Sequence, residues 1–257
     1  GEGAVTTGKV VFAGSNGRVT VAAGGRHVGM RLASGSDPSS VTFTAGKSGN
    51  VLAISNAVFE SAMPFAQNCA LVTKGGPQYD AVPFTGCSGC RIELVGADAK
   101  FLVTSKQRYV GDSRWYSCAL GEMIDRSGET PAWTTAAYSL DNPVRVRFCL
   151  PAEGWSEAPF RVTSGIAVLG GNAEFEFDAS GYTWPVKTTR VPLIYNSEAY
   201  DGWGHRKYIN VAQLNATNAD RLPVNPNGRK AKLALSEDGT TLDLVMPGIG
   251  GMVIMVR

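Results

Sequence analysis

Short apolar runs with a period of two recur along the chain, and turns rich in Gly, Asn and Asp separate them. In residues 91–104, Ile92 and Leu94 precede a glycine corner, and Phe101 and Val103 follow it. Alternation with a period of two predicts a strand that buries one face. Because it holds on both sides of the corner, we expect two short strands that share one buried face.

The same unit recurs elsewhere in the chain. Residues 165–178 align with 91–104 without a gap, so that the apolar pair, the corner glycine and the phenylalanine coincide. A looser copy covers 51–59, and a degenerate one begins at Val19. Such self-similarity indicates a chain that stacks one supersecondary unit, each copy burying its neighbour's apolar face.

The pattern divides the chain into three parts without a long linker, so we predict a single domain over 1–257. Residues 1–104 form N-terminal coils, and 144–257 form C-terminal coils and a cap. Between them, 105–143 has little periodicity and is expected to be an irregular insertion.

The C-terminal third predicts a more mixed structure. Residues 232–246 alternate around a turn that contains glycine, which predicts a β-hairpin. A helical turn is expected within Val211–Leu222. The apolar run 191–195 reads as a strand, and Pro192 places it at a sheet edge or at a strand start.

These units resemble the passenger regions of bacterial surface proteins with autotransporter-associated β-strand repeats. The resemblance rests on 51–59, Val168–Tyr182, the Pro-Leu-Ile strand at 192–194 and the ending Leu235–Leu244. It implies an all-β fold, a right-handed parallel β-helix (solenoid) with a loop insertion and a C-terminal hairpin cap. It also implies a location outside the cell or on a bacterial cell surface. The alternative fold is a β-sandwich or jelly roll, which short alternating strands also suit.

Composition removes several classes of function. The net charge is +2, and no basic run is interleaved with aromatic residues, so we expect no nucleic-acid partner. No run of 18 apolar residues exists, so no membrane span is predicted. Charged residues make up only 18% of the chain, and it contains 31 glycines. This composition is typical of a β-rich extracellular fold.

The cysteines do not predict a metal centre. Cys87 and Cys90 have the CxxC spacing, but the three other cysteines are scattered singly. Zinc needs two further ligands at a matching spacing. A redox motif would open a helix, whereas this one precedes a strand. We therefore predict no metal and no cofactor.

Candidate ligand contacts gather in the insertion and one later loop, where flat rings and charged groups suit sugar faces and interaction hot spots. The second role open to such aromatics, Trp155 and Trp184 included, is to cover the ends of a stack. The candidates are Asp112, Arg114, Trp115, Tyr116, Trp133 and Trp203.

No catalytic residue is predicted, because no nucleophile motif orders a serine with His27 or His205. We expect a non-enzymatic surface module for adhesion, filament assembly or glycan contact, with self-association through the ends of the stack. The alternative is a carbohydrate-active enzyme, a polysaccharide lyase or glycoside hydrolase. Its carboxylates would be Asp112, Glu122, Asp125 and Glu129, since Glu174, Glu176 and Asp178 are expected on a solvated face.

Overall fold

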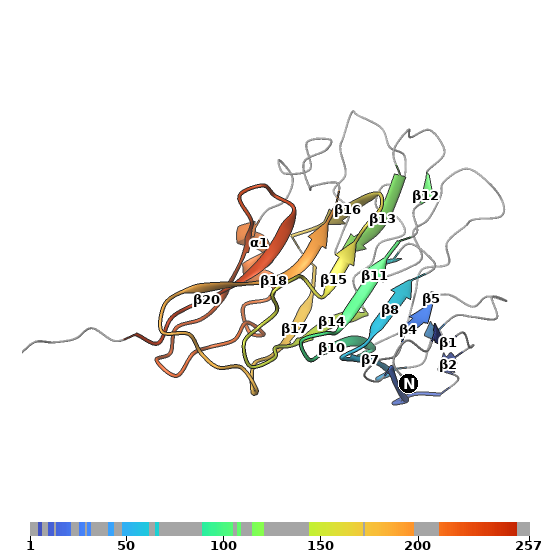
Figure 1. Cartoon of the computed structure of the whole chain (residues 1–257), viewed down its shortest axis with the longest axis horizontal. Helices are drawn as coiled ribbons and strands as arrows, with labels where there is room; N and C mark the ends of the chain where they lie inside the picture. The colour runs from blue at the N-terminus through green and yellow to red at the C-terminus, as the bar shows by residue number, and fades with distance from the viewer. Residues whose placement is uncertain are drawn as a thin grey trace, which may run out of the picture.

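The computed structural model describes five longer segments and several isolated short strands. The segments are residues 14–21, 48–61, 89–104, 144–197 apart from Asn172, and 211–250. Within them the chain is mostly β-strand, and the strands pair into two large sheets and two small ones. Figure 1 shows the two large sheets side by side with the single described helix at the C-terminal end.

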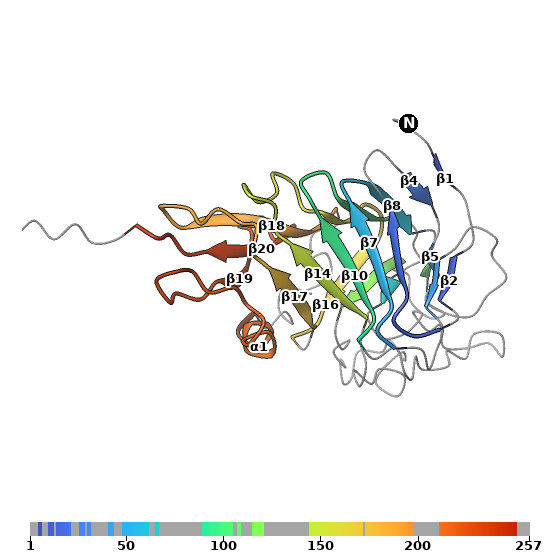
Figure 2. The same cartoon turned by 90° about the horizontal axis from the view of Figure 1, so that it is seen from below.

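The first large sheet has five strands, all parallel, in the order β17-β14-β10-β7-β3. Each strand is short, and neighbouring strands lie in register, as Figure 2 shows for β7, β10, β14 and β17. The strands are β3 (Arg18–Val21), β7 (Val51–Ser55), β10 (Arg91–Val95), β14 (Arg145–Cys149) and β17 (Phe175–Asp178).

The second large sheet is mixed. Its eight strands follow the order β1-β4-β8-β11-β15-β18-β20-β19, parallel as far as β18 and antiparallel beyond it. The strands are β1 (Val5–Thr6), β4 (Arg26–Val28), β8 (Val58–Ser61), β11 (Lys100–Val103), β15 (Phe160–Val162), β18 (Thr189–Asn196), β19 (Lys232–Leu235) and β20 (Thr241–Met246).

The remaining strands form two small sheets. One joins β9 (Phe65–Ala66), β12 (Gln107–Arg108), β13 (Trp115–Leu120) and β16 (Ile166–Leu169). The other joins β2 (Val10–Phe12), β5 (Met30–Arg31) and β6 (Val41–Phe43). Helix α1 spans Val211–Thr217, within the segment where the sequence predicts a helical turn.

The repeat copies at 19, 51 and 91 pair with one another as the sequence predicts. Val19 lies opposite Leu52, and Leu52 lies opposite Ile92 in the five-stranded sheet. After the corner, Phe59 lies opposite Phe101 in the mixed sheet. Each of these copies therefore supplies one strand to each large sheet.

The copy at 165–178 has a different place. Its two strands are β16, which belongs to a small sheet, and β17, which belongs to the five-stranded sheet. The buried positions of β16 include Ala167 and Leu169, which lie outside the aligned apolar pair. On the side of β10 that faces away from β7, the partner is not this copy but the segment Arg145–Cys149. The alignment thus identifies a strand–corner–strand unit, but the two strands of this unit do not pair with the matching strands of 91–104.

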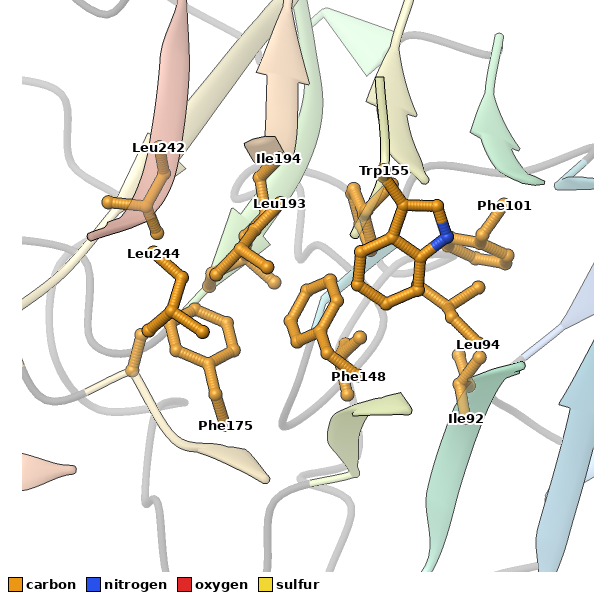
Figure 3. Packing of buried hydrophobic residues seen from close by; sticks show 14 of the residues in the cluster. Ile92, Leu94, Phe101, Phe148, Trp155, Phe175, Leu193, Ile194, Leu242 and Leu244 are labelled. Atoms are coloured by element: carbon orange, nitrogen blue, oxygen red, sulfur yellow. The ribbon is translucent and has the colours of Figure 1, made fainter. Parts of the chain in front are cut away.

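A single core joins the sheets. In the mixed sheet the rings of Phe59, Phe101 and Phe160 follow one another, with centroids 5.8 and 5.0 Å apart. Phe148 contacts Phe175 at a centroid distance of 6.0 Å, and Figure 3 shows both rings in the shared core. All five side chains are fully buried. Aromatic pairs of this kind add to the free energy that apolar burial itself provides.

The prediction of a right-handed parallel β-helix is wrong. The described strands form one all-parallel and one mixed sheet, with one helix, and among them no closed solenoid is found. Each unit turns one corner between two sheets, and the strands beyond β18 reverse direction instead of continuing the stack. The β-sandwich or jelly-roll alternative is also wrong, because the repeat copies pair in parallel.

Two C-terminal predictions have different outcomes. The hairpin over 232–246 is confirmed, since β19 and β20 pair with Leu233 opposite Leu244. Pro192 lies within an interior strand, so its placement at a sheet edge or strand start is wrong. It is tolerated because β15 pairs only with the segment from Ile194 onward and the register against β20 shifts beside Pro192.

Candidate functional site

The outer face of the five-stranded sheet carries a charged groove, which we call the arginine groove. It encloses about 630 Å³ and includes three arginines and two carboxylates in its lining. One wall is formed by the segments that follow β14 and β17. The lining residues are Arg18, Arg91, Glu93, Val95, Gly96, Arg147, Cys149, Leu150, Pro151, Ala152, Asp178, Ser180 and Gly181.

Parallel pairing in register brings these side chains together. Residues at alternate positions of a strand point to the same face, and register partners on neighbouring strands lie side by side. Arg91 lies opposite Arg145, and Glu93 lies opposite Arg147. Polar residues that are two apart in each strand therefore become two columns of charge across the sheet.

Glu93 is the centre of the groove. Its side chain is only 6% exposed, and Oε1 accepts a hydrogen bond of 2.7 Å from Nε of Arg91. Nη2 of Arg18 lies 2.6 Å from Oε2, and Nη1 of Arg147 lies 3.8 Å from Oε1. Three arginines from three different strands thus surround one buried carboxylate.

The Arg18 pair spans an intervening strand. Arg18 is on β3 and Glu93 is on β10, and β7 lies between these two strands. The register partner of Glu93 on β7 is Ala53, which is 1% exposed although it alternates with the core residues Leu52 and Ile54. A small residue at this position leaves room for the Arg18 side chain to reach Glu93.

The other acidic groups lie at the β17 side of the sheet. Nη2 of Arg147 donates a 2.8 Å hydrogen bond to Asp178. Nε of Arg145 donates a 2.7 Å bond to Glu174, and Nη1 of Arg145 lies 3.6 Å from Glu176. The sequence prediction that Glu174, Glu176 and Asp178 occupy the outer face is therefore correct.

Both groove carboxylates are held in the charged form. Burial opposes ionisation of Glu93, but the hydrogen bonds and charges of Arg91 and Arg18 outweigh it and lower its pKa. Hydrogen bonds from Ser180, followed by the contact with Arg147, lower the pKa of Asp178. By contrast, burial raises the pKa of the Cys149 thiol. The groove therefore presents fixed charges at neutral pH and a protonated thiol.

The described residues of the groove include none of the contact residues predicted from the sequence. Trp115 and Tyr116 belong to β13, and nothing further is described of their side chains. The other four, Asp112, Arg114, Trp133 and Trp203, fall outside the described residues, as do Glu122, Asp125 and Glu129.

Sequence reasoning missed the groove because no local motif marks it. The available signal is a charged pair two residues apart within a strand, Arg91 with Glu93 and Arg145 with Arg147. Such pairs normally read as a solvated face. Only the parallel register shows that Arg18, far away in sequence, meets the same carboxylate.

Within the described part of the chain there is neither a cluster of metal ligands nor a helix that could span a membrane. No group of three or more His, Cys, Asp or Glu side chains is placed to hold a metal ion. No helix there has the length and apolar character needed to cross a bilayer.

Comparison with protein-family models, with curated proteins and with solved structures finds no match.

Proposed function

We propose that the protein is a non-enzymatic binding module that holds an acidic glycan in the arginine groove. The observation that carries this proposal is the cluster of Arg18, Arg91 and Arg147 around one buried carboxylate at the floor of an open groove. Glu93 orients the guanidinium groups, and they exceed the groove carboxylates by one positive charge, three against two.

The arginines keep hydrogen-bonding capacity for a ligand. A guanidinium carries five N–H groups. Arg91 donates to Glu93 through Nε, which leaves both of its terminal nitrogens for a ligand oxygen. Arg91 and Arg147 are each about 30% exposed, so their heads are accessible. A planar guanidinium can bind a carboxylate or sulfate group through two parallel hydrogen bonds.

The arrangement suits a linear, regularly charged polymer. Neighbouring strands lie about 4.8 Å apart, so a column of arginines on successive strands is a row of cations with a regular pitch. Arg91 and its register partner Arg145, which adjoins the groove, are one strand spacing apart, whereas Arg18 is two spacings from Arg91 because β7 carries Val51 between them. An acidic polysaccharide whose carboxylates or sulfates fall at multiples of the strand spacing would match this row.

A glycoside hydrolase mechanism at this groove is disfavoured. Glycosidases need one carboxylic acid that stays protonated near neutral pH to protonate the leaving group. Glu93 and Asp178 both have lowered pKa values and are paired with arginines. An enzyme that uses the carboxylates of 105–143 is a separate prediction about residues outside the described part of the chain.

The composition favours a place outside the cell, and the resemblance to bacterial surface proteins implies display on a bacterial cell surface; both are part of the proposal. Low charge content and many glycines suit an exported β-rich protein.

The test is binding to acidic and neutral oligosaccharides of equal length by isothermal titration calorimetry, with R91Q, R147Q and R190Q variants. Arg190 pairs with Asp243 in the mixed sheet, outside the groove, so R190Q is the matched control for loss of one charge. We expect each groove variant to lose about tenfold in affinity for the acidic glycan, as for loss of one charge-assisted hydrogen bond.

Three results would overturn the proposal. One is equal binding of acidic and neutral chains, and another is equal losses in all three variants. The third is stronger binding of a single-stranded oligonucleotide of the same charge, which would assign the arginines to a nucleic-acid backbone.

A further inference from the structure

Helix α1 lies at the end of both large sheets. Strand β17 is the last strand of the five-stranded sheet, and β19 is the last strand of the mixed sheet. Figure 2 shows α1 beside β17 and β19. We propose that α1 is an edge cap, in which two asparagine side chains take the place of an added strand and prevent a second copy of the chain from joining there.

Asn218, which directly follows α1, closes the parallel edge. Its Oδ1 accepts a 2.8 Å hydrogen bond from the backbone N–H of Phe175, and its Nδ2 donates a 2.8 Å bond to the carbonyl of Ala173. A residue of an added parallel strand would use the same two groups, one on each side of Glu174. Asn218 is fully buried, so its amide fills this position completely.

Asn215 closes the antiparallel edge in the same way. Its Oδ1 accepts a 2.8 Å bond from the N–H of Leu233, and its Nδ2 donates a 2.9 Å bond to the carbonyl of the same residue. Exchange of both bonds with one residue is the pattern of a hydrogen-bonded antiparallel pair. The two asparagines thus each reproduce the pairing geometry of the sheet that they terminate.

Other contacts fix the helix in this position. Leu214 is fully buried in the common core. The hydroxyl of Thr217 donates a 2.9 Å bond to the carbonyl of Gly171, and Nη2 of Arg221 lies 3.2 Å from Glu174. The second N–H of each asparagine amide bonds to the helix itself, at the carbonyls of Val211 and Leu214. Both N–H groups of each amide are therefore used, and each amide oxygen accepts one hydrogen bond.

The partner excluded by the cap is a second copy of this chain. An uncovered sheet edge is a template for strand addition. Among the described strands, β3 is the opposite end of the same parallel sheet, so β3 of a second copy could continue the ladder beyond β17. That contact is head-to-tail and does not close on itself, so it would propagate into a chain of copies.

The test compares the oligomeric state of N215A/N218A with that of the unmodified protein by size-exclusion chromatography with light scattering across a concentration series. The matched control is V162A, which removes buried volume from the interior strand β15 and leaves both edges intact. We expect the double variant to at least double its mass as concentration rises, while V162A keeps the mass of the unmodified protein.

Hydrogen exchange at the amides of Phe175 and Leu233 reports directly on the two edges. If both amides exchange faster in the double variant while its mass does not change, the proposal is wrong. Equal association of V162A would also overturn it, because general destabilisation would then be the cause. Should the double variant not fold, N215D and N218D keep the acceptor oxygen and remove the donor. Self-association of both aspartate variants supports the edge cap. If both aspartate variants remain monomeric, the proposal is wrong.

Discussion

The side-chain amide of Asn56 occupies the space that a β-carbon on Gly96 would fill. Asn56 belongs to the corner between β7 and β8, and Gly96 begins the corner between β10 and β11. Oδ1 of Asn56 also accepts a 3.3 Å hydrogen bond from the backbone N–H of Asp98. Corners of successive repeats are therefore interlocked, with the amide of one seated on the glycine of the next.

Replacement of Gly96 by alanine should strongly destabilise the fold. Gly96 has φ +85°, a conformation that costs a residue with a β-carbon about 1–2 kcal/mol. The new methyl group would also collide with the Asn56 side chain. We expect a total loss of about 3 kcal/mol in the free energy of unfolding, measured by urea denaturation.

A second glycine separates the two contributions. Gly228 has φ +75°, but among the described residues no heavy atom outside its two chain neighbours lies within 4 Å of the position of its β-carbon. G228A should therefore lose only the conformational part, about 1–2 kcal/mol. N56G should recover much of the loss in G96A, because Asn56 has φ +45° and glycine tolerates that angle. Additive effects of N56G and G96A would contradict the interlocking of the corners.

Trp155, which lies between β14 and β15, extends this interlocking to the next pair of strands. Its side chain is 5% exposed, and its Nε1–H donates a 2.9 Å hydrogen bond to the carbonyl of Gly96. The expectation that aromatic residues in loops plug the ends of a stack does not describe Trp155, which packs inside the core against Phe148 at a centroid distance of 6.1 Å. Figure 3 shows the indole among the core side chains.

The Trp155 hydrogen bond and the Trp155 ring should contribute separately to stability. W155F keeps most of the ring and removes the donor, so we expect a loss of about 1–2 kcal/mol in the free energy of unfolding. W155A also leaves a cavity and should cost about 3–5 kcal/mol. Chemical denaturation of both variants checks the order, and equal losses would mean that the hydrogen bond, not the packing, dominates.

The sequence predicted a strand wherever apolar and polar residues alternate with a period of two, as they do in β10, β11, β14 and β20. Sheet membership was not predictable, because the corners that follow Val95 and Leu169 share glycine and small residues, and their units share the same apolar alternation. The copy at 165–178 resembles 91–104 for that reason, although its strands occupy a different pair of sheets. The arginine groove was hidden for a related reason, since it depends on register between strands distant in sequence.

A large side chain at position 53 should disrupt the arginine groove. Ala53 is 1% exposed on β7, beneath the ion pair that joins Arg18 on β3 to Glu93 on β10. In A53L the leucine would stand between these two strands, so we expect loss of the Arg18 contact and a higher pKa for Glu93. A carbon-detected NMR titration of the Glu93 carboxyl group measures this shift.

The control for that experiment is A234L, because Ala234 lies on β19 of the mixed sheet and is only partly buried. Its leucine should leave the Glu93 titration unchanged. If the pKa of Glu93 is unchanged in A53L, Arg18 reaches Glu93 by another path. The explanation that Ala53 leaves room for Arg18 would then be wrong.

The charge of Glu93 should make stability depend on pH in the acidic range. The pKa of Glu93 in the folded protein lies below its ordinary value of 4.5, because Arg91 and Arg18 outweigh the effect of burial. The folded state therefore binds this proton more weakly than the unfolded chain. The resulting stabilisation is fully present above pH 4.5 and disappears as the pH falls through the folded pKa.

Comparison with E93Q isolates this contribution, since Asp178 and all other carboxylates titrate in both proteins. At pH 7 the variant should be less stable by about 1–3 kcal/mol, because Arg91 and Arg18 lose a charged hydrogen-bond acceptor. As the pH falls below 4.5, protonation makes Glu93 as neutral as glutamine, so the two free energies of unfolding should converge. Urea denaturation from pH 7 to pH 3 measures both curves. Curves that stay parallel would mean that the arginines do not lower the pKa of this carboxylate, and that Glu93 is held by packing alone.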